Sequence, residues 1–346
     1  MRWADVYLAG TGAYLPERRE SARRAVATGR YDAAESTANG IRAVRVAGPA
    51  EPPPVMAVAA ARQALDRAGR PTDGGPTLVI HASLGHQGLD FWTPAHYIRR
   101  ETIGGDGPTF EIRHSSNGGM AAIETAAAYL TAMPAVTAAV ITAADAFALP
   151  YVDRWRSENQ QVYGDGAGAL VLTREPGLAR LVATATVTDS GLEPIYRGAA
   201  EWVAAPMPDG GPVDLRGRKR EYLLLSPERY DEAIEQTQAG LRTALDNALA
   251  DAGITVDGVD LFVHPVIGET VVAYTYGERL GIPATATLYD WGRDIGHLGA
   301  ADQFVQLHHL LVNGLVRAGR HVVAIGSGAG FGWTVAVWEI LPTAPR

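Results

Sequence analysis

Two glycine-rich segments, each followed by an apolar run typical of a strand, constrain the fold of this chain more than any other sequence feature. The sequence Gly-Asp-Gly-Ala-Gly-Ala at 164–169 leads into the apolar run 170–172, and Gly-Ser-Gly-Ala-Gly-Phe at 326–331 takes the same place 162 positions later. Self-similarity at a fixed spacing is typical of a duplicated unit. We therefore expect two related halves, residues 1–175 and 176–346.

Strand patterns alternate with helical patterns through both halves. Strands are expected at 6–9, 77–80, 110–112, 138–142, 169–172, 261–263, 321–325 and 334–339. Helices are expected at 58–68, ended by Gly69, at 94–101, at 117–133, at 227–252 with Ser226 as its cap, at 269–280 and at 300–312. A turn is expected at 10–12 and a surface excursion at 17–55. This alternation predicts an α/β fold with a largely parallel central sheet.

The glycine segments themselves are interpreted as tight turns where strands cross closely. They precede strands rather than opening a helix, and they lack the third-glycine spacing of a dinucleotide fingerprint. No Walker motif is present either. Nothing in these segments predicts a nucleotide redox cofactor.

Composition excludes several classes of function. Hydrophobic residues make up 47% and charged residues 20%, which is the usage of a globular protein. The net charge of −8 offers no basic surplus for nucleic acid. The chain has no cysteine, which rules out disulfides, cysteine-bound metals and a thiolate nucleophile, and no histidine spacing predicts a metal site. With no apolar leader or membrane-length segment in view, we expect a cytoplasmic protein without a membrane partner.

The most informative segment is 110–120, where a strand pattern turns sharply into a helix that is apolar almost all round. Such a helix is expected to be buried. Ser115 and Ser116 stand where it begins, in the positive field of the helix N-terminus. From the residues alone, these serines are either helix caps or a reactive hydroxyl at a buried site.

Three ordered motifs identify a family resemblance. The sequences Gly-Thr-Gly-Ala-Tyr-Leu-Pro at 10–16, Tyr-Gly-Asp-Gly-Ala-Gly-Ala at 163–169 and Gly-Ser-Gly-Ala-Gly at 326–330 resemble those of the ketosynthase III branch of the thiolase superfamily. The resemblance implies a thiolase-like fold with five layers, α/β/α/β/α, and a homodimer. It also implies an acyl group held on a buried nucleophile after delivery from CoA or an acyl carrier protein.

Carried over residue by residue, the resemblance places the family's nucleophilic cysteine at Ser116, its histidine at His264 and its asparagine at His297. The family's decarboxylative condensation uses that asparagine, so its replacement removes a group needed to form a carbon–carbon bond. A histidine after glycine at this place resembles instead the thiolases, where it activates the nucleophile.

A serine hydroxyl needs a base before it can attack, more than a cysteine does. His297 is the expected base, and Asp302 is expected to hold its far nitrogen, which makes a Ser-His-Asp unit by role. His264 is then expected to orient the acceptor or to help hold the oxyanion. Backbone donors to the oxyanion are expected from Ser116 with Gly328 or Gly330.

Five further residues are candidates for binding the substrate. Arg42, Arg45 and Arg154 are positioned to meet the phosphates of an acyl donor, the alternative being that each is a solvated surface arginine. In the resembled family the loop that carries Phe91 and Trp92 lies near the acyl pocket and the dimer interface. These two residues are therefore expected to help form the pocket.

The predicted function is an acyltransferase of secondary-metabolite biosynthesis, of the polyketide and antibiotic kind, that moves a short acetyl, propionyl or malonyl-type group. Acyl-CoA or acyl carrier protein is the co-substrate, no cofactor is held permanently, and the acceptor is a small molecule or a carrier protein. The alternatives are a starter-unit β-ketoacyl synthase III that condenses with malonyl-carrier protein, an inactive homologue, and an engineered variant in which serine replaces a native cysteine.

Overall fold

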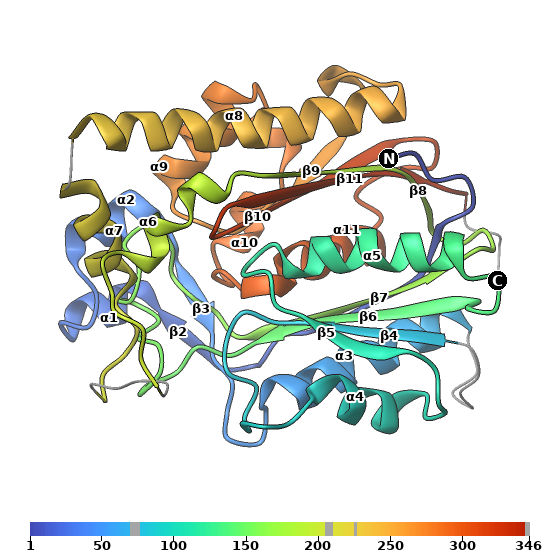
Figure 1. Cartoon of the computed structure of the whole chain (residues 1–346), viewed down its shortest axis with the longest axis horizontal. Coiled ribbons are helices and arrows are strands. Elements are labelled where there is room, and N and C mark those ends of the chain that lie inside the picture. The colour runs from blue at the N-terminus through green and yellow to red at the C-terminus, as the bar shows by residue number, and fades with distance from the viewer. Residues whose placement is uncertain (70–76, 205–209, 225–226, 343–346) are drawn as a thin grey trace.

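The computed structural model describes residues 1–69, 77–204, 210–224 and 227–342. Its described strands form one nine-stranded sheet, in the order β5-β4-β6-β7-β1-β8-β11-β10-β9, and a separate two-stranded sheet. The large sheet bends between β1 and β8 into two halves that face each other across a helical layer (Figure 1). With helices on both outer faces, this gives the five-layered thiolase-like architecture that was expected.

The first half of the sheet contains β1 (Tyr7–Tyr14), β4 (Thr77–Ala82), β5 (Thr109–Ile112), β6 (Ala138–Asp145) and β7 (Gly166–Thr173). The second half contains β8 (Ala179–Thr188), β9 (Leu261–Val263), β10 (His321–Gly328) and β11 (Gly332–Ile340). Only Tyr7 and Leu8 of β1 pair with β8, so the joint between the halves is short. The small sheet consists of β2 (Arg19–Ser21) and β3 (Ala43–Arg45).

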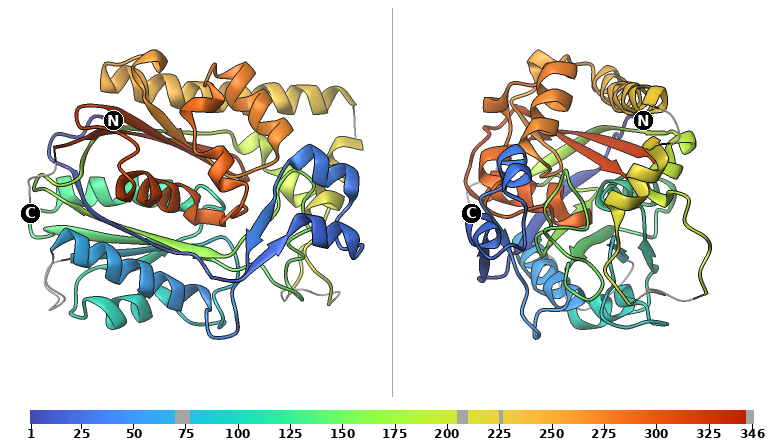
Figure 2. Two further views of the ribbon diagram at one scale, coloured as in Figure 1. Left: turned by 180° about the vertical axis from the view of Figure 1, so that it is seen from behind. Right: turned by 90° about the vertical axis from the view of Figure 1, so that its left-hand side faces the viewer.

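The longer helices form the layers. They are α3 (Pro53–Ala68) and α4 (Pro94–Thr102) below, α5 (Gly118–Ala132) and α11 (Asp302–Val312) in the middle, and α8 (Pro227–Ala252) above with α9 (Glu269–Val272) and a π-helical segment, η3 (Ala273–Arg279) (Figures 1 and 2). Because both sheet halves pack on the middle layer, Met120, Ile123 and Leu130 of α5 are fully buried, while the side that carries Glu124 and Ala128 stays accessible to solvent.

Shorter elements complete the chain. They are α1 (Ala22–Ala27), α2 (Ala33–Asn39), α6 (Pro194–Arg197), α7 (Leu215–Leu224), α10 (Tyr289–Gly292) and the 3-10 turns η1 (Ser190–Leu192), η2 (Val256–Gly258), η4 (Ala284–Ala286) and η5 (Gly299–Ala301). Helices α1, α2, α6 and α7 gather at one end of the molecule, at the left of Figure 1.

The order of elements repeats along the chain. The series β1-α3-β4-α5-β6-β7 is followed by β8-α8-β9-α11-β10-β11, and in both series the last two strands are antiparallel neighbours. The repeat accords with the expected duplication. A division of the chain at 175/176, in the link between β7 and β8, stays our prediction.

The expected predominance of parallel strands is wrong. Within the described part of the large sheet, three strand pairings are parallel and five are antiparallel. A parallel neighbour needs a crossover connection, usually a helix. No helix separates β6 from β7 or β10 from β11 in the chain, so each of these pairs runs antiparallel.

Two local expectations are also corrected. The segment 10–12 is not a turn but lies inside β1, where a Cβ on Gly10 or Gly12 would come within about 2 Å of backbone carbonyls of α3. The excursion at 17–55 contains α1, α2, β2 and β3, and it buries Tyr31 and Val44 in a small core that it shares with distant residues such as Trp155 and Tyr289. Its apolar residues are too widely spaced to show this core in the sequence.

Most of the remaining expected elements are present, with small shifts at their ends. Gly69 ends α3 in a left-handed conformation, as expected, with φ 61°. The expected helix 269–280 begins as α9 but continues as the π-helical segment η3. Ser226, the expected cap of α8, lies outside the described residues.

Candidate active site

Ser116 lies in the sharp turn between β5 and α5. Ser115, just before it, has φ 48°, a left-handed conformation that few residues other than glycine adopt. Gly328 packs against the same turn, because a Cβ there would lie 2.6 Å from the carbonyl oxygen of His114. The two glycine-containing strands β10 and β11 therefore close over the turn that presents Ser116.

His297 reaches Ser116 from the second half of the chain. The Ser116 Oγ and His297 Nε2 atoms are 2.8 Å apart, and His297 Nδ1 is 2.6 Å from Asp302 Oδ2. An ionised carboxylate only accepts hydrogen bonds, so Nδ1 donates to Asp302 and Nε2 is left to accept from the Ser116 hydroxyl. The arrangement can thus move a proton from Ser116 Oγ to His297 Nε2.

The Asp302 carboxylate is fixed in place by burial and by further hydrogen bonds. It is 1% exposed, and its two oxygens also accept from the backbone N–H groups of Val266, at 2.8 Å to Oδ2, and Leu298, at 2.8 Å to Oδ1. These bonds fix the position of the carboxylate behind His297. Ser116, His297 and Asp302, predicted from the sequence to act together, are brought together by the fold.

Asp145, at the end of β6, is a residue that the sequence analysis missed. It is fully buried and accepts hydrogen bonds from the backbone N–H groups of Leu84, Gly85 and Ala300. Burial raises the pKa of Asp145 to about 6 against the effect of these bonds. Through Ala300 it fixes the segment between His297 and Asp302, and no local sequence signal points to that role.

His264 is also buried but is held differently. Its Nδ1 lies 2.9 Å from the carbonyl oxygen of Pro265 and donates to it, and its ring stacks on Tyr276 at 4.1 Å. Its Nε2 is buried and has no hydrogen-bond partner among the described residues. Burial lowers the pKa of His264 to about 4, so the ring is neutral and Nε2 is an acceptor. His264 is not among the cavity-lining residues, and its expected role of orienting the acceptor or helping to hold the oxyanion stays a prediction.

A cavity of about 790 Å³ opens beside the Ser116–His297 pair. Ser115, Ser116 and His297 line it, together with Ser327 and Ala329 from the C-terminal glycine turn. Gly328 and Gly330, the expected oxyanion donors, are neighbours of these lining residues and do not themselves line the cavity. Their backbone role stays a prediction.

The predicted arginines do not reach the cavity. Arg42 is half-exposed and bonds Asp290 and Asp294, while Arg154 is buried in a two-pronged ion pair with Asp165. Arg45 donates to the carbonyl oxygen of Pro16. None of these three arginines is among the cavity-lining residues.

Phe91 and Trp92 lie on an exposed loop away from the cavity lining of this chain. Phe91 is fully exposed with φ 51°, and Trp92 packs on Tyr97 with ring centroids 5.8 Å apart. The role expected of them in the pocket is not seen within one chain and stays a prediction.

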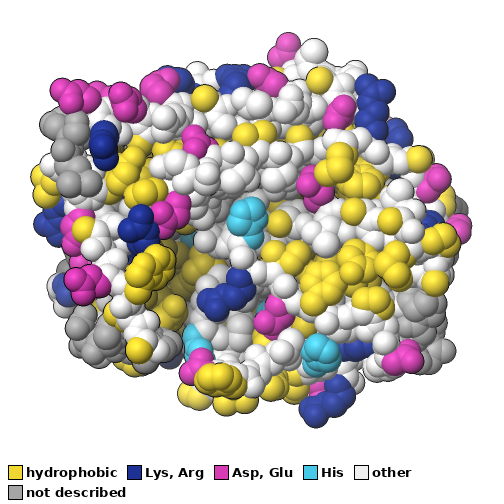
Figure 3. Space-filling view, viewed as in Figure 1, with side chains coloured by type: hydrophobic (Ala, Val, Ile, Leu, Met, Phe, Trp, Pro, Cys, Tyr) yellow, Lys and Arg dark blue, Asp and Glu magenta, His cyan; other side chains and the backbone are white. Residues whose placement is uncertain are grey.

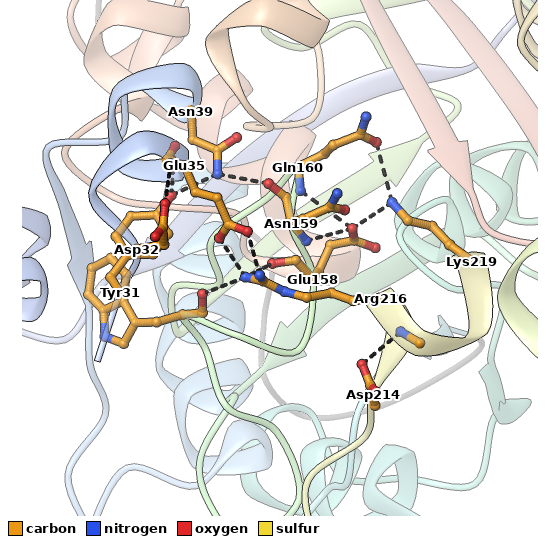
Figure 4. A network of polar contacts seen from close by, with 12 residues as sticks. Tyr31, Asp32, Glu35, Asn39, Glu158, Asn159, Gln160, Asp214, Arg216 and Lys219 are labelled. Atoms are coloured by element: carbon orange, nitrogen blue, oxygen red, sulfur yellow. Dashed lines mark hydrogen bonds and ion pairs between the residues drawn. The ribbon is translucent and has the colours of Figure 1, made fainter. Parts of the chain in front are cut away.

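The far wall of the cavity carries a polar network that the sequence analysis also missed. Arg216 of α7 forms a two-pronged ion pair with Glu35 of α2. Lys219 of α7 pairs with Glu158, and its Nζ lies 2.6 Å from Glu158 Oε1 (Figure 4). In the space-filling view, both signs of charge lie beside apolar side chains at this end of the molecule (Figure 3). The contacts join segments far apart in the chain, so no local motif predicts them.

No group of three metal-binding side chains comes together within the described ranges. In the same part of the chain, every helix is too short or too polar to cross a bilayer.

The site combines a serine in a strand-to-helix turn with a histidine from the second half of the chain, and it lies at the middle layer between two facing sheet halves. This combination defines a thiolase-fold site of the acyl-transferring class. Comparison with known proteins gives the family. Residues 110–190 match the model for 3-oxoacyl-[acyl-carrier-protein] synthase III, and residues 249–340 match the model for its C-terminal part. The chain belongs to this ketosynthase III family.

Individual relatives agree over the whole chain. A solved structure described as the acyltransferase ChlB3 is 33% identical, with a TM-score of 0.92 and 99% of each chain covered. The β-ketoacyl-[acyl-carrier-protein] synthase III of Rhizorhabdus wittichii is 28% identical over 94% of this chain and 97% of its own length. A priming β-ketosynthase of the R1128 polyketide pathway, 22% identical with a TM-score of 0.76 and 99% and 98% of the two chains covered, shares the fold. The chain is therefore an acyl-transferring enzyme of the ketosynthase III type.

Proposed function

We propose that this protein is an acyltransferase that carries a short acyl group as an ester on Ser116. One observation carries the proposal: the Ser116 hydroxyl, the His297 imidazole and the Asp302 carboxylate form one continuous hydrogen-bonded chain. A base of this kind is what a hydroxyl nucleophile requires.

In the first step, Ser116 Oγ attacks the carbonyl carbon of a thioester from CoA or an acyl carrier protein. The Oγ proton passes to His297 Nε2, the C–S bond breaks, and the proton passes on to the thiolate that leaves. Asp302 stabilises the imidazolium formed between these events. The product is the Ser116 ester and a free thiol.

In the second step, an acceptor hydroxyl, amine or thiol attacks the ester carbonyl. His297 Nε2 takes the acceptor's proton, the bond from the acyl carbon to Ser116 Oγ breaks, and the proton returns to Oγ. The second step is the reverse of the first in its proton transfers, so one base serves both.

Decarboxylative condensation is the second candidate, because the full-length relatives include proteins named β-ketoacyl synthase III. His297 stands at the place assigned to the family's asparagine. Its Nε2 is within hydrogen-bond distance of the Ser116 hydroxyl. This favours activation of a hydroxyl over polarisation of a malonyl group. Release of carbon dioxide and a β-ketoacyl product from malonyl-carrier protein would reverse the ranking.

Mass spectrometry of the protein after incubation with acetyl-, propionyl- and malonyl-CoA tests the proposal. The peptide that contains Ser116 is expected to gain the mass of one acyl group, and the Ser116→Ala variant is expected to gain none and to lose at least about 10³-fold in turnover. A Ser116 peptide without acyl groups across the panel, or turnover that survives in Ser116→Ala, contradicts the proposal. The Ser116→Cys variant compares the two nucleophiles on one scaffold.

The same proposal includes a homodimer, a place in the cytoplasm and a role in polyketide or antibiotic biosynthesis. Size-exclusion chromatography with light scattering tests the dimer. A monomer that acylates Ser116 at full rate would separate the chemistry from the assembly.

A further inference from the structure

A chain of hydrogen bonds runs from the surface of α5 to the turn that presents the nucleophile. Thr186 Oγ1 lies 3.1 Å from Glu124 Oε1 and 2.9 Å from Thr334 Oγ1. Asn117 Nδ2 lies 2.9 Å from Thr334 Oγ1 and 3.3 Å from His114 Nδ1. Glu124 and Thr186 are accessible to solvent, and Thr334 and Asn117 are fully buried. The chain therefore connects the protein surface to the residues on either side of the two serines.

The carboxylate at one end gives the chain a single direction. An ionised carboxylate only accepts, so the hydroxyl hydrogen of Thr186 points to Glu124. Thr334 must then donate to Thr186, and its Oγ1 accepts from Asn117 Nδ2. The second hydrogen of Asn117 Nδ2 goes to His114 Nδ1, so His114 carries its proton on Nε2. Burial lowers the pKa of His114, which keeps this ring neutral at pH 7.5.

The same direction determines which atom of the Asn117 amide faces β10. Its Oδ1 is buried without a partner among the described residues, and it lies against Gly326, where a Cβ would come within 2.3 Å. A Cβ on Gly328 would likewise lie 2.8 Å from Asn117 Cβ. The reverse amide orientation would place an NH₂ group, with two hydrogens and no acceptor, in this tight contact. The direction of the amide thus sets how closely β10 packs on the nucleophile turn.

The packing of β10 on this turn bears on the active site. Ser327, near the end of β10, and Ala329, just after it, line the cavity beside Ser116. Asn117 also closes the turn around Ser116, because its backbone N–H donates to the carbonyl oxygen of His114 at 3.1 Å while its side chain bonds the His114 ring. None of the five residues of the hydrogen-bonded chain lines the cavity. The chain can therefore act on the reaction through the position of Ser116, and not through contact with a substrate.

We propose that Glu124 is a positioning residue, whose carboxylate acts through the hydrogen-bonded chain to hold the Asn117 amide in the orientation that places Ser116 for attack. This inference rests on the proposed acyl transfer through Ser116 and adds no proton transfer to it. When the charge is removed, both amide orientations become available. A small displacement of the nucleophile then lowers the rate of attack without changing substrate binding.

Two surface substitutions interrupt the chain without touching the cavity. Thr186→Val removes a link with a side chain of nearly the same shape, and Glu124→Gln removes the charge. The burst of free CoA after mixing with acetyl-CoA gives the rate of Ser116 acylation. Both variants are expected to acylate about two- to tenfold more slowly, the effect of one hydrogen bond, at an unchanged half-saturating concentration of acetyl-CoA. The double variant is expected to be no slower than the slower single one, because both changes break the same chain.

Thr188→Val is the matched control. Thr188 lies two positions after Thr186 in β8, on the same face of the strand, and it is also exposed. Its hydroxyl bonds no other residue in the described part of the chain. The same loss of a hydroxyl is therefore expected to leave acylation at the wild-type rate.

Nitrogen-15 NMR of protein labelled at histidine reads the direction of the chain independently of the rate. Wild type at pH 7.5 is expected to show His114 with its proton on Nε2, and the signals are identified by their loss in His114→Gln. Glu124→Gln and Thr186→Val are expected to add a form with the proton on Nδ1, because a reversed amide presents Asn117 Oδ1 to that nitrogen.

Wild-type acylation rates in both Glu124→Gln and Thr186→Val overturn the inference and leave the proposed function standing. An equal loss of rate in Thr188→Val, or a wild-type His114 that carries its proton on Nδ1, overturns the inference in the same way. Absence of a CoA burst with wild type across acetyl-, propionyl- and malonyl-CoA overturns both the inference and the proposed function.

Discussion

His297 and His264 are both about 1% exposed and both come from the second half of the chain, yet their surroundings give them opposite properties. His297 has a partner at each nitrogen, a carboxylate at Nδ1 and a hydroxyl at Nε2. His264 bonds a neutral carbonyl through Nδ1, and its Nε2 has no partner among the described residues. An imidazole backed by a carboxylate can accept and hold a proton, whereas a buried one backed only by a carbonyl stays neutral. The difference supports our prediction that His297, rather than His264, is the base.

The largest expected effect comes from exchanging the two histidines separately for glutamine. His297→Gln removes the base that contacts Ser116, so acylation of Ser116 by acetyl-CoA should slow by about 10³-fold or more. His264→Gln keeps an N–H for the Pro265 carbonyl and should slow acylation by less than about tenfold. Rapid-quench measurement of the CoA burst gives both rates. Equal decreases in the acylation rate of the two variants would contradict the prediction that only His297 acts as the base.

The next largest effect is expected from changing Asp302, the carboxylate that contacts His297 Nδ1. In Asp302→Asn, an amide N–H facing His297 Nδ1 would force that nitrogen to accept, which moves the ring proton to Nε2 and leaves no acceptor for the Ser116 hydroxyl. Acylation is expected to slow by about 10²- to 10⁴-fold. Because Asp302 also accepts from Val266 and Leu298, the variant's melting temperature is measured alongside. A folded variant with an unchanged burst would mean that the carboxylate does not set the tautomer.

The sequence was sufficient to predict the components that follow local rules. Apolar strand patterns, the Gly69 helix end and the apolar helix after Ser116 depend on neighbours within a few residues, and the structure has each of them. The Ser116, His297 and Asp302 grouping was predicted through the family resemblance, since 181 positions separate the first two residues and no spacing rule connects them.

What the sequence did not predict depends on contacts between distant segments. Arg42 and Arg154 bond carboxylates that only the tertiary fold brings near, so they are not free for a substrate phosphate. Asp145 carries no local motif, and it accepts hydrogen bonds from backbone groups about 60 and 155 positions away in the chain. Glu158 likewise pairs with Lys219, which lies 61 positions further on. The prediction of mostly parallel strands was wrong for a related reason. Whether a pair is parallel depends on which strands become neighbours in the fold.

The smallest of the three effects concerns stability rather than rate and isolates His264. Burial lowers the pKa of His264 from its usual 6.5 to about 4, so between these two pH values the unfolded chain binds more protons at this residue than the folded chain does. Stability therefore increases with pH through this window and levels off above it. At pH 4.5, the free energy of unfolding of wild type should be about 2–3 kcal/mol lower through this residue than at pH 7.5.

His81 and His308, whose pKa values burial also lowers to about 4, make the stability depend on pH in the same way. The quantity to measure is therefore the difference in free energy of unfolding between wild type and His264→Gln. Urea unfolding at several pH values from 4.5 to 7.5 measures it: as the pH falls, the free energy of unfolding of wild type should decrease by about 2–3 kcal/mol relative to that of His264→Gln, because only wild type must keep a buried histidine neutral. Parallel curves would mean that His264 is charged in the folded protein, and its contrast with His297 would then need another cause.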